Sequence, residues 1–401
     1  MSNQSDRLID PMTIVQELAS LPHRGATTKQ ERKAADMVQR YLEGMGAAVT
    51  RQKFQTAKTY ISEVWWLVGG LALGLLLIPL ASWFAFGLVT VCAGLSLVYF
   101  DWRHTPVSLL PPRAISENVI GVSAGKGKQA PDSTEKEKKR LILMAHYDSA
   151  PVSLLYLPSM VKNFRQSLLI SLGLMVVAVF VALFEVLAIG QPLATWLRWL
   201  LAIYFLSQAM MSTIDYIRYG FTNGAADNAT GTAIAMATAE RLWKEPLPGW
   251  EVEVVLTGAE ETGMAGAKFY YKMNRERFAS KPTYLFNFDN IGSGDLKIIT
   301  KTGSISNVIY DNALARAAME TASSESRFNK IKTSVWHTGD FDSIWFVRGG
   351  IPGLTLSAQD ENGQIPNLHR PSDTIENVDA SLPPFAVEFA EATVRRLANQ
   401  A

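Results

Sequence analysis

The chain has 401 residues, of which 48% are apolar and 19% charged, and its formal net charge is +1. This composition excludes intrinsic disorder, and the charge shows none of the basic excess typical of nucleic-acid-binding proteins, so we expect no nucleic-acid partner. The single cysteine, Cys92, excludes an intrachain disulfide and a cysteine-based zinc site.

Taken in chain order, the first residues do not resemble a secretory signal, because residues 1–12 lack a basic segment followed by an apolar stretch. Hydrophobic periodicity predicts helices at 12–20 and 28–45 and a strand at 48–54. Residues 125–140 are rich in charge and predict a surface loop. Further strands are expected at the short apolar runs 118–123, 141–145, 252–257, 284–288 and 353–357. Further helices are expected at 230–243, 313–322 and 384–397.

Two long charge-poor blocks interrupt this pattern. Residues 64–100 carry no charge and are too long for one membrane span of about 20 residues, so they predict two helices that turn near 79–82. Residues 167–214 predict two more spans, because Gly190-Gln191-Pro192 is a turn signal at their centre. Buried hairpins in a soluble core are the alternative. We expect an integral membrane protein with four transmembrane helices in contact with the lipid bilayer.

The basic residues suggest an orientation. Both hairpins return the chain to the side that it left, so all the polar sequence lies on one face. The turns contain only Arg198, whereas the outer ends of the spans are flanked by Arg51, Lys53, Lys58, Arg103, Arg113, Lys162, Arg165 and Arg218. The positive-inside rule therefore predicts that the polar part of the chain faces the cytoplasm.

The second hairpin holds two charged residues, Glu185 and Arg198, at equal distances from its turn. Antiparallel helices place them at about the same depth, less than about 10 Å below the turn. We expect an ion pair that fixes the helix register, with separate snorkelling of both side chains as the alternative.

Outside these blocks, apolar strands alternate with helices. This alternation predicts an α/β fold with a mixed, largely parallel sheet sandwiched by helices. Polar residues follow three of the strands, as His146-Tyr147-Asp148, Glu260-Glu261 and Asp289. Ligands collect at the carboxyl ends of strands in such sheets.

Two further candidates lie in loops. Asp227 precedes a helix within a Gly/Ala segment, and His369 lies in a loop bounded by prolines. Imidazole and carboxylate groups without thiolates suit a catalytic zinc site. The set is larger than one zinc needs and suits two metals bridged by a carboxylate, with a further carboxylate as general base. Singly, each residue also has a structural explanation, such as a helix cap or a turn.

Together, HYDS, AADNATGTA, GAEETGMAGA, NFDNIG and NLHRPSD resemble the zinc-dependent aminopeptidases related to bacterial leucyl aminopeptidase and glutamate carboxypeptidase, which share their fold with glutaminyl cyclase. The resemblance covers almost all of the chain outside the apolar blocks and implies a zinc exopeptidase fold with two zinc ions per chain. It implies that His146 and Asp289 bind one ion, Glu261 and His369 the other, and Asp227 both. Glu260 would be the general base, and Asp148 would orient His146.

The resemblance also shows two departures. The segment around Asp342 resembles a family Ser-Asp-His segment, but Ser343 stands where the histidine is usual, which leaves the roles of Asp342 and Ser343 open. The membrane hairpins are the larger departure. They divide the chain into catalytic parts at 1–62, 102–164 and 216–401 and hairpins at 63–101 and 165–215.

The expected function is therefore that of a membrane-anchored di-zinc metallopeptidase. We expect an aminopeptidase that hydrolyses N-terminal residues of peptides with water activated by the metals. A glutaminyl cyclase-like acyltransferase, an inactive membrane scaffold of the same fold and a transporter are the alternatives. Residue preference, metal identity and oligomeric state are left open by the sequence.

Overall fold

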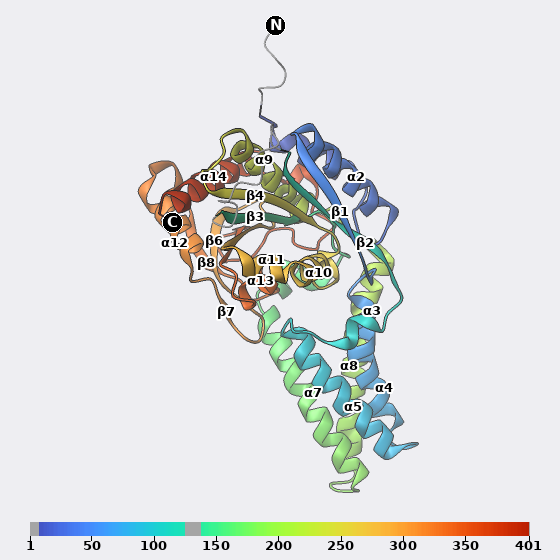
Figure 1. Cartoon of the computed structure of the whole chain (residues 1–401). Coiled ribbons are helices and arrows are strands. Elements are labelled where there is room, and N and C mark those ends of the chain that lie inside the picture. Colours follow the sequence, from blue (N-terminus) through green and yellow to red (C-terminus); the bar gives the residue numbers. More distant parts are fainter. Residues whose placement is uncertain (1–7, 125–137, 401) are drawn as a thin grey trace.

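The computed structural model describes residues 8–124 and 138–400, so most of the predicted loop 125–140 and the first residues of the segment 1–12 lie outside the described residues. A globular part contains the sheet, and a narrow helical stalk projects from one side of it (Figure 1). We use "the stalk" for the helical residues within 61–100 and 164–219.

Within the described residues, nine strands form one mixed sheet in the order β1-β2-β4-β3-β5-β9-β6-β7, with β8 paired to β6. The four central strands, β4, β3, β5 and β9, run parallel, and antiparallel strands flank them. The bounds are β1 Ala47–Ala57, β2 Arg113–Ser123, β3 Lys139–His146, β4 Trp250–Thr257, β5 Thr283–Phe288, β6 Asp295–Thr302, β7 Val308–Ile309, β8 Lys332–Val335 and β9 Gly353–Gln359.

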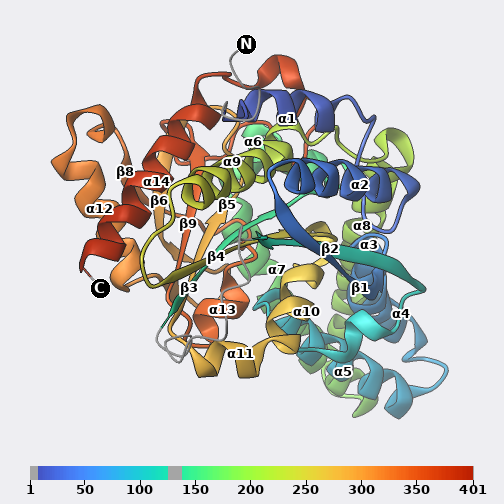
Figure 2. The same ribbon diagram turned by 45° about the horizontal axis from the view of Figure 1, so that its top comes forward.

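Helices cover both faces of this sheet (Figure 2). One face carries α1 Pro11–Ala19, α2 Lys29–Gly44, α9 Gly231–Lys244, α12 Ala313–Ser324 and α14 Leu382–Gln400. The other carries α10 Ala265–Met273, α11 Arg275–Ser280 and α13 Ile344–Arg348. Strand β3 shows why both faces need cover, because Leu143 belongs to one apolar core and its neighbours Ile142 and Met144 belong to the other. The predicted fold class is confirmed.

The stalk is a four-helix bundle made by both hairpins together (Figure 1). Its second, third and fourth helices, α5 Ser82–Phe100, α7 Phe164–Val186 and α8 Leu193–Tyr219, are long and apolar enough to cross a membrane. The first, Ile61–Leu77, is shorter and consists of α3 Ile61–Val64, the π-helical turn η2 Trp65–Gly69 and α4 Gly70–Leu77. In the described part of the chain, three of the four expected spans are therefore long enough to cross a membrane, and the first is shorter.

Close packing joins the two helices of the first hairpin. A Cβ added to Gly74 would lie 2.8 Å from Val89 Cγ2, and one added to Gly70 would lie 2.9 Å from Cys92 Sγ. Glycines four residues apart on one helix face allow such close approach between membrane helices. The outer surface of the stalk is apolar instead, with Trp83 and Trp196 64% and 68% exposed.

The predicted pair inside the second hairpin is confirmed. Arg198 Nε lies 2.8 Å from Glu185 Oε2, and both side chains are buried. Arg198 also donates a hydrogen bond from Nη1 to the carbonyl of Leu75 at 3.2 Å. Because Leu75 belongs to α4, this pair connects the second hairpin to the first as well as fixing its own register.

Polar contacts fasten the base of the stalk to the globular part. Asp101 Oδ1 accepts hydrogen bonds from Ser306 N at 2.8 Å and from its hydroxyl at 2.6 Å. Arg348 Nη1 donates to the carbonyls of Asp101 and Trp102. Asp215, in the last turns of α8, accepts a hydrogen bond from Leu154 N at 2.9 Å. These bonds connect the end of the first hairpin and the last helix of the second hairpin to the globular part.

Candidate metal centre

The sheet brings the strand-end residues together as expected. His146 is the last residue of β3, Glu260 and Glu261 follow β4, and Asp289 follows β5. Asp227 lies in the kinked helical turn η6 Ala225–Thr230 before α9. His369 lies in the loop after β9. These six residues and Asp148 form what we call the site cluster.

Asp227 lies between the two histidines. Its Oδ1 is 3.3 Å from His146 Nε2, and its Oδ2 is 3.3 Å from His369 Nε2. His146 Nε2 is also 3.7 Å from Asp289 Oδ2, whereas His369 Nε2 is 3.1 Å from Glu261 Oε2. The cluster therefore divides into two half-sites that share one carboxylate, with the same pairs of residues that the sequence resemblance implies.

The donor set fits bound cations. Single ligand atoms of His146, Asp227 and Glu261 all lie within 4.8 Å of one another. Among the buried side-chain atoms without a hydrogen-bond partner are Asp227 Oδ2 and Glu261 Oε1. Buried carboxylate oxygens are costly without a compensating charge, and imidazole with carboxylate is the ligand set that zinc accepts. The residues present therefore fit a zinc centre, while the individual ligand roles stay predictions.

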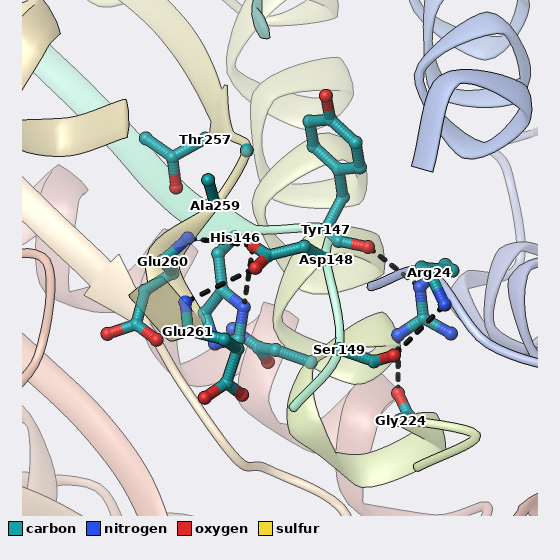
Figure 3. A network of polar contacts seen from close by, with 12 residues as sticks. Arg24, His146, Tyr147, Asp148, Ser149, Gly224, Thr257, Ala259, Glu260 and Glu261 are labelled. Atoms are coloured by element: carbon teal, nitrogen blue, oxygen red, sulfur yellow. Dashed lines mark hydrogen bonds and ion pairs between the residues drawn. The ribbon is translucent and has the colours of Figure 1, made fainter. Parts of the chain in front are cut away.

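Asp148 holds two parts of the cluster at once (Figure 3). Its Oδ1 accepts a hydrogen bond from Glu260 N at 3.0 Å, and its Oδ2 accepts one from Glu261 N at 3.2 Å. Its Oδ1 is also 3.5 Å from His146 Nδ1. One buried carboxylate thus positions both the imidazole and the turn that carries the two glutamates, which is more than the orienting role expected.

Burial and neighbouring charges shift the pKa values of the cluster. Burial raises the pKa of Glu260 well above its usual value and that of Glu261 to about 7. Burial opposes protonation of His369, but the charges of Glu261 and Asp227 outweigh it and raise its pKa to about 10. The pKa of Asp227 is lowered despite burial, because both histidine side chains lie against its carboxylate. Bound metal ions would have to displace these protons.

The loop that carries Asp227 depends on a glycine. Asn228 Oδ1 accepts a hydrogen bond from Gly231 N at 2.9 Å, and Asn228 Nδ2 donates to the carbonyl of Phe288 at 2.9 Å. A Cβ at Gly231 would lie 2.2 Å from Asn228 Oδ1 and 2.4 Å from Phe288 O. Only glycine allows this contact, which joins the loop of Asp227 to the strand that precedes Asp289.

Two positioning residues were not found from the sequence. Arg24 is fully buried and donates hydrogen bonds to the carbonyls of Tyr147 at 2.7 Å and Gly224 at 2.6 Å (Figure 3). Asp373 accepts hydrogen bonds from the backbone N–H groups of Ala226 and Asp227 at 2.7 and 3.2 Å. Asp373 stands in the NLHRPSD segment and could have been noticed there, whereas no local signal marks Arg24.

Asp342 and Ser343 are buried beside the cluster. Asp342 accepts a hydrogen bond from the Thr257 hydroxyl, and its charge helps to raise the pKa of Glu260. Ser343 Oγ lies 2.8 Å from both the Tyr310 and the Thr355 hydroxyls. The serine in the usual histidine position thus belongs to a buried hydroxyl network.

Comparisons with known proteins agree with this fold. Residues 209–388 match the sequence model of peptidase family M28. No curated protein matches the chain at a significant level. Solved structures with the same fold include a zinc aminopeptidase from Bacillus subtilis, at 14% identity and a TM-score of 0.56 over 96% of this chain and 94% of that one.

Two further structures are similar. An aminopeptidase from an Aneurinibacillus strain shares 15% identity, with a TM-score of 0.56 over 97% of this chain and 94% of that one. A leucine aminopeptidase precursor from Bacteroides thetaiotaomicron shares 13% identity, with a TM-score of 0.54 over 99% of this chain and 97% of that one. The family match and the fold together confirm the predicted resemblance to zinc aminopeptidases and the predicted class, a zinc-dependent metallopeptidase.

Proposed function

We propose that this zinc-dependent metallopeptidase is a membrane-anchored aminopeptidase that uses two zinc ions. The observation that carries the proposal is the position of Asp227, whose two carboxylate oxygens each lie 3.3 Å from a different histidine. A single metal ion would use one histidine with its neighbouring carboxylate and would leave the other histidine and carboxylate without a role. Two zinc ions in this site would polarise the scissile carbonyl and supply an acidic water.

In the reaction, Glu260 is the general base. It is partly exposed and lines the cavity at the cluster, so its carboxylate can reach an attacking water and can both accept and return a proton. Glu260 takes the proton of the attacking water and delivers it to the leaving amine. Asp148 fixes the backbone of Glu260 during both transfers.

Metal analysis of the lipid-reconstituted chain, combined with hydrolysis of a panel of aminoacyl amides, tests the proposal. Two zinc ions per chain and release of N-terminal residues are expected. One zinc ion with cyclisation of N-terminal glutamine would favour a cyclase instead. Absence of both metal and turnover would favour a scaffold.

We further propose that the stalk crosses the bilayer and that the globular part faces the cytoplasm. The tip of the stalk holds the basic residue Arg198, which is paired with Glu185, whereas Arg103, Arg165 and Arg218 lie near the base. Cysteine labelling in a Cys92→Ser background tests this proposal at Gln191 and at residue 130, which lies outside the described residues. Labelling of residue 130 from outside intact cells would reverse the orientation.

A further inference from the structure

A cavity of about 310 Å³ begins at the site cluster and continues into the stalk. At one end its wall contains His146, Asp227 and Glu260. At the other end it is lined by Val68, Met175 and Gln208, which belong to three different helical segments of the stalk. The membrane hairpins therefore supply part of the wall of the candidate active site as well as an anchor.

The depth of this cavity follows from two helices independently. Met175 lies eleven residues after Phe164, the first residue of α7, and Gln208 lies eleven residues before Tyr219, the last residue of α8. At 1.5 Å per residue, both positions are about 16 Å along the stalk from the globular part. An extended peptide covers that distance with about five residues, so the cavity is longer than any single side chain.

The volume indicates a slender occupant. Ligand sites for compact small molecules begin at about 300 Å³, but here a similar volume, about 310 Å³, is spread over the site cluster and two turns or more of the stalk. A compact ligand would fill only one end of it. A single extended chain matches its length.

The chemistry of the wall favours a peptide chain over a hydrocarbon chain. Apolar residues such as Val68, Leu168 and Met175 alternate along the cavity with Ser171, Gln208 and Ser212. Gln208 Nε2 donates hydrogen bonds to Ser171 Oγ and to Tyr204 OH, both at 2.8 Å, and its amide oxygen takes no part in these bonds. Peptide groups away from water need hydrogen-bond partners, whereas an acyl chain does not.

We propose that the stalk cavity binds the apolar residues that follow the scissile bond of the substrate. The inference rests on the proposed aminopeptidase function, because an aminopeptidase leaves only one residue before that bond. The cavity is too long for one residue, so the longer part of the substrate occupies it. The preferred substrates are peptides whose second to about fifth residues are apolar, bound between helices of the stalk.

The test compares peptides in the full chain reconstituted in lipid nanodiscs. Wild type should hydrolyse Ala-Leu-Leu-Leu with at least a tenfold higher kcat/KM than Ala-Gly-Gly-Gly, with alanyl amide as the reference substrate. Met175→Trp fills the far end of the cavity and should lower that ratio at least fivefold. Val177→Trp is the matched control, because Val177 is on the same helix, is 44% exposed and is outside the cavity; its ratio should stay at the wild-type value.

Gln208→Leu provides a second variant if Met175→Trp fails to fold. It keeps the volume close to that of glutamine but removes the hydrogen-bonding group, so it should lower the kcat/KM for Ala-Leu-Leu-Leu relative to that for alanyl amide. Two results would overturn the inference while alanyl amide hydrolysis still supports the proposed function. One is an equal kcat/KM for the two peptides in wild type. The other is a wild-type kcat/KM for Ala-Leu-Leu-Leu, relative to alanyl amide, in both Met175→Trp and Gln208→Leu. A third result would favour an acyl chain as the occupant and would also overturn the inference. In it, dodecanoate inhibits peptide hydrolysis by wild type but not by Met175→Trp, and wild type shows no preference between the two peptides. Absence of all aminoacyl hydrolysis would overturn the proposed function itself.

Discussion

The globular part and the stalk both bury charge, but they balance it differently. In the stalk, Glu185 and Arg198 form a pair that is complete without any ligand. In the site cluster, the carboxylates of Asp227, Glu261 and Asp289 surround two histidines, which can balance them only when they carry protons. The comparison indicates that the first arrangement is balanced as it stands, whereas the second fits bound cations.

The largest effect is expected from Glu260→Gln. Hydrolysis should fall by about 10²–10⁴-fold, because the general base is lost, while the zinc content stays near two ions per chain. Steady-state kinetics and metal analysis of the same preparation check both statements. Loss of one metal in this variant would mean that the roles of Glu260 and Glu261 are reversed.

Asp227→Asn should reduce metal occupancy at both half-sites, since this carboxylate faces both histidines. Equilibrium dialysis against buffered zinc measures the occupancy, and Asp295→Asn, on the exposed start of β6, serves as the control. Two tightly held ions in Asp227→Asn would rule out the bridging role.

A smaller effect is expected in the stalk. Glu185→Gln or Arg198→Gln alone should each cost about 3–5 kcal/mol, because a single variant leaves a buried charge without its partner. The double variant should lose clearly less than the sum of the two, while hydrolysis in the folded fraction is kept. Additive losses of stability in a double-mutant cycle would show that the ion pair contributes nothing.

The smallest effect concerns a buried carboxyl away from the metals. Burial and the charge of Asp148 raise the pKa of Glu31 to about 8 from 4.5, although hydrogen bonds from Ser116 and Thr27 oppose the shift. The folded chain therefore keeps a proton between these values that the unfolded chain releases. This contribution to stability is complete below about pH 4.5 and is lost as the pH rises through about 8.

Glu31→Gln should accordingly reduce the fall in stability between pH 5 and pH 8. The upper limit is about 1.4 kcal/mol per unit of pKa difference. Chemical denaturation at both pH values measures the effect, with Glu43→Gln as the control on the exposed face of the same helix. Identical pH profiles for wild type and Glu31→Gln would contradict the assignment.

The site cluster could be located from the sequence because the carboxyl ends of parallel strands meet at one edge of a sheet. His146, Glu260 and Asp289 each follow an apolar run that is long enough to identify a buried strand. Arg24 and Asp373 could not be predicted in the same way. They bond to backbone groups of distant loops, and such contacts leave no periodic pattern in the sequence. The strands β6, β7 and β8 were also missed, since they are short or polar and lie toward one edge.

The stalk shows the same limit. Hydropathy located its helices, and the equal spacing of Glu185 and Arg198 from the turn predicted their pairing. The union of both hairpins into one bundle includes the bond from Arg198 to the carbonyl of Leu75, which connects segments far apart in the chain. The cavity between the helices follows from that union and could not be predicted from either hairpin alone.

The places where the hairpins interrupt the sheet have a consequence for biosynthesis. The first hairpin separates β1 from its neighbour β2, and the second separates β3 from its neighbour β4. Neither strand pair can form until the intervening hairpin has closed and returned its chain end to the sheet. A ribosome therefore delivers each hairpin before the strand that follows it can complete its pair. Under the membrane anchoring proposed above, insertion of the hairpins would come before assembly of the active site. A chain whose hairpins do not close would leave β1 without β2 and β3 without β4.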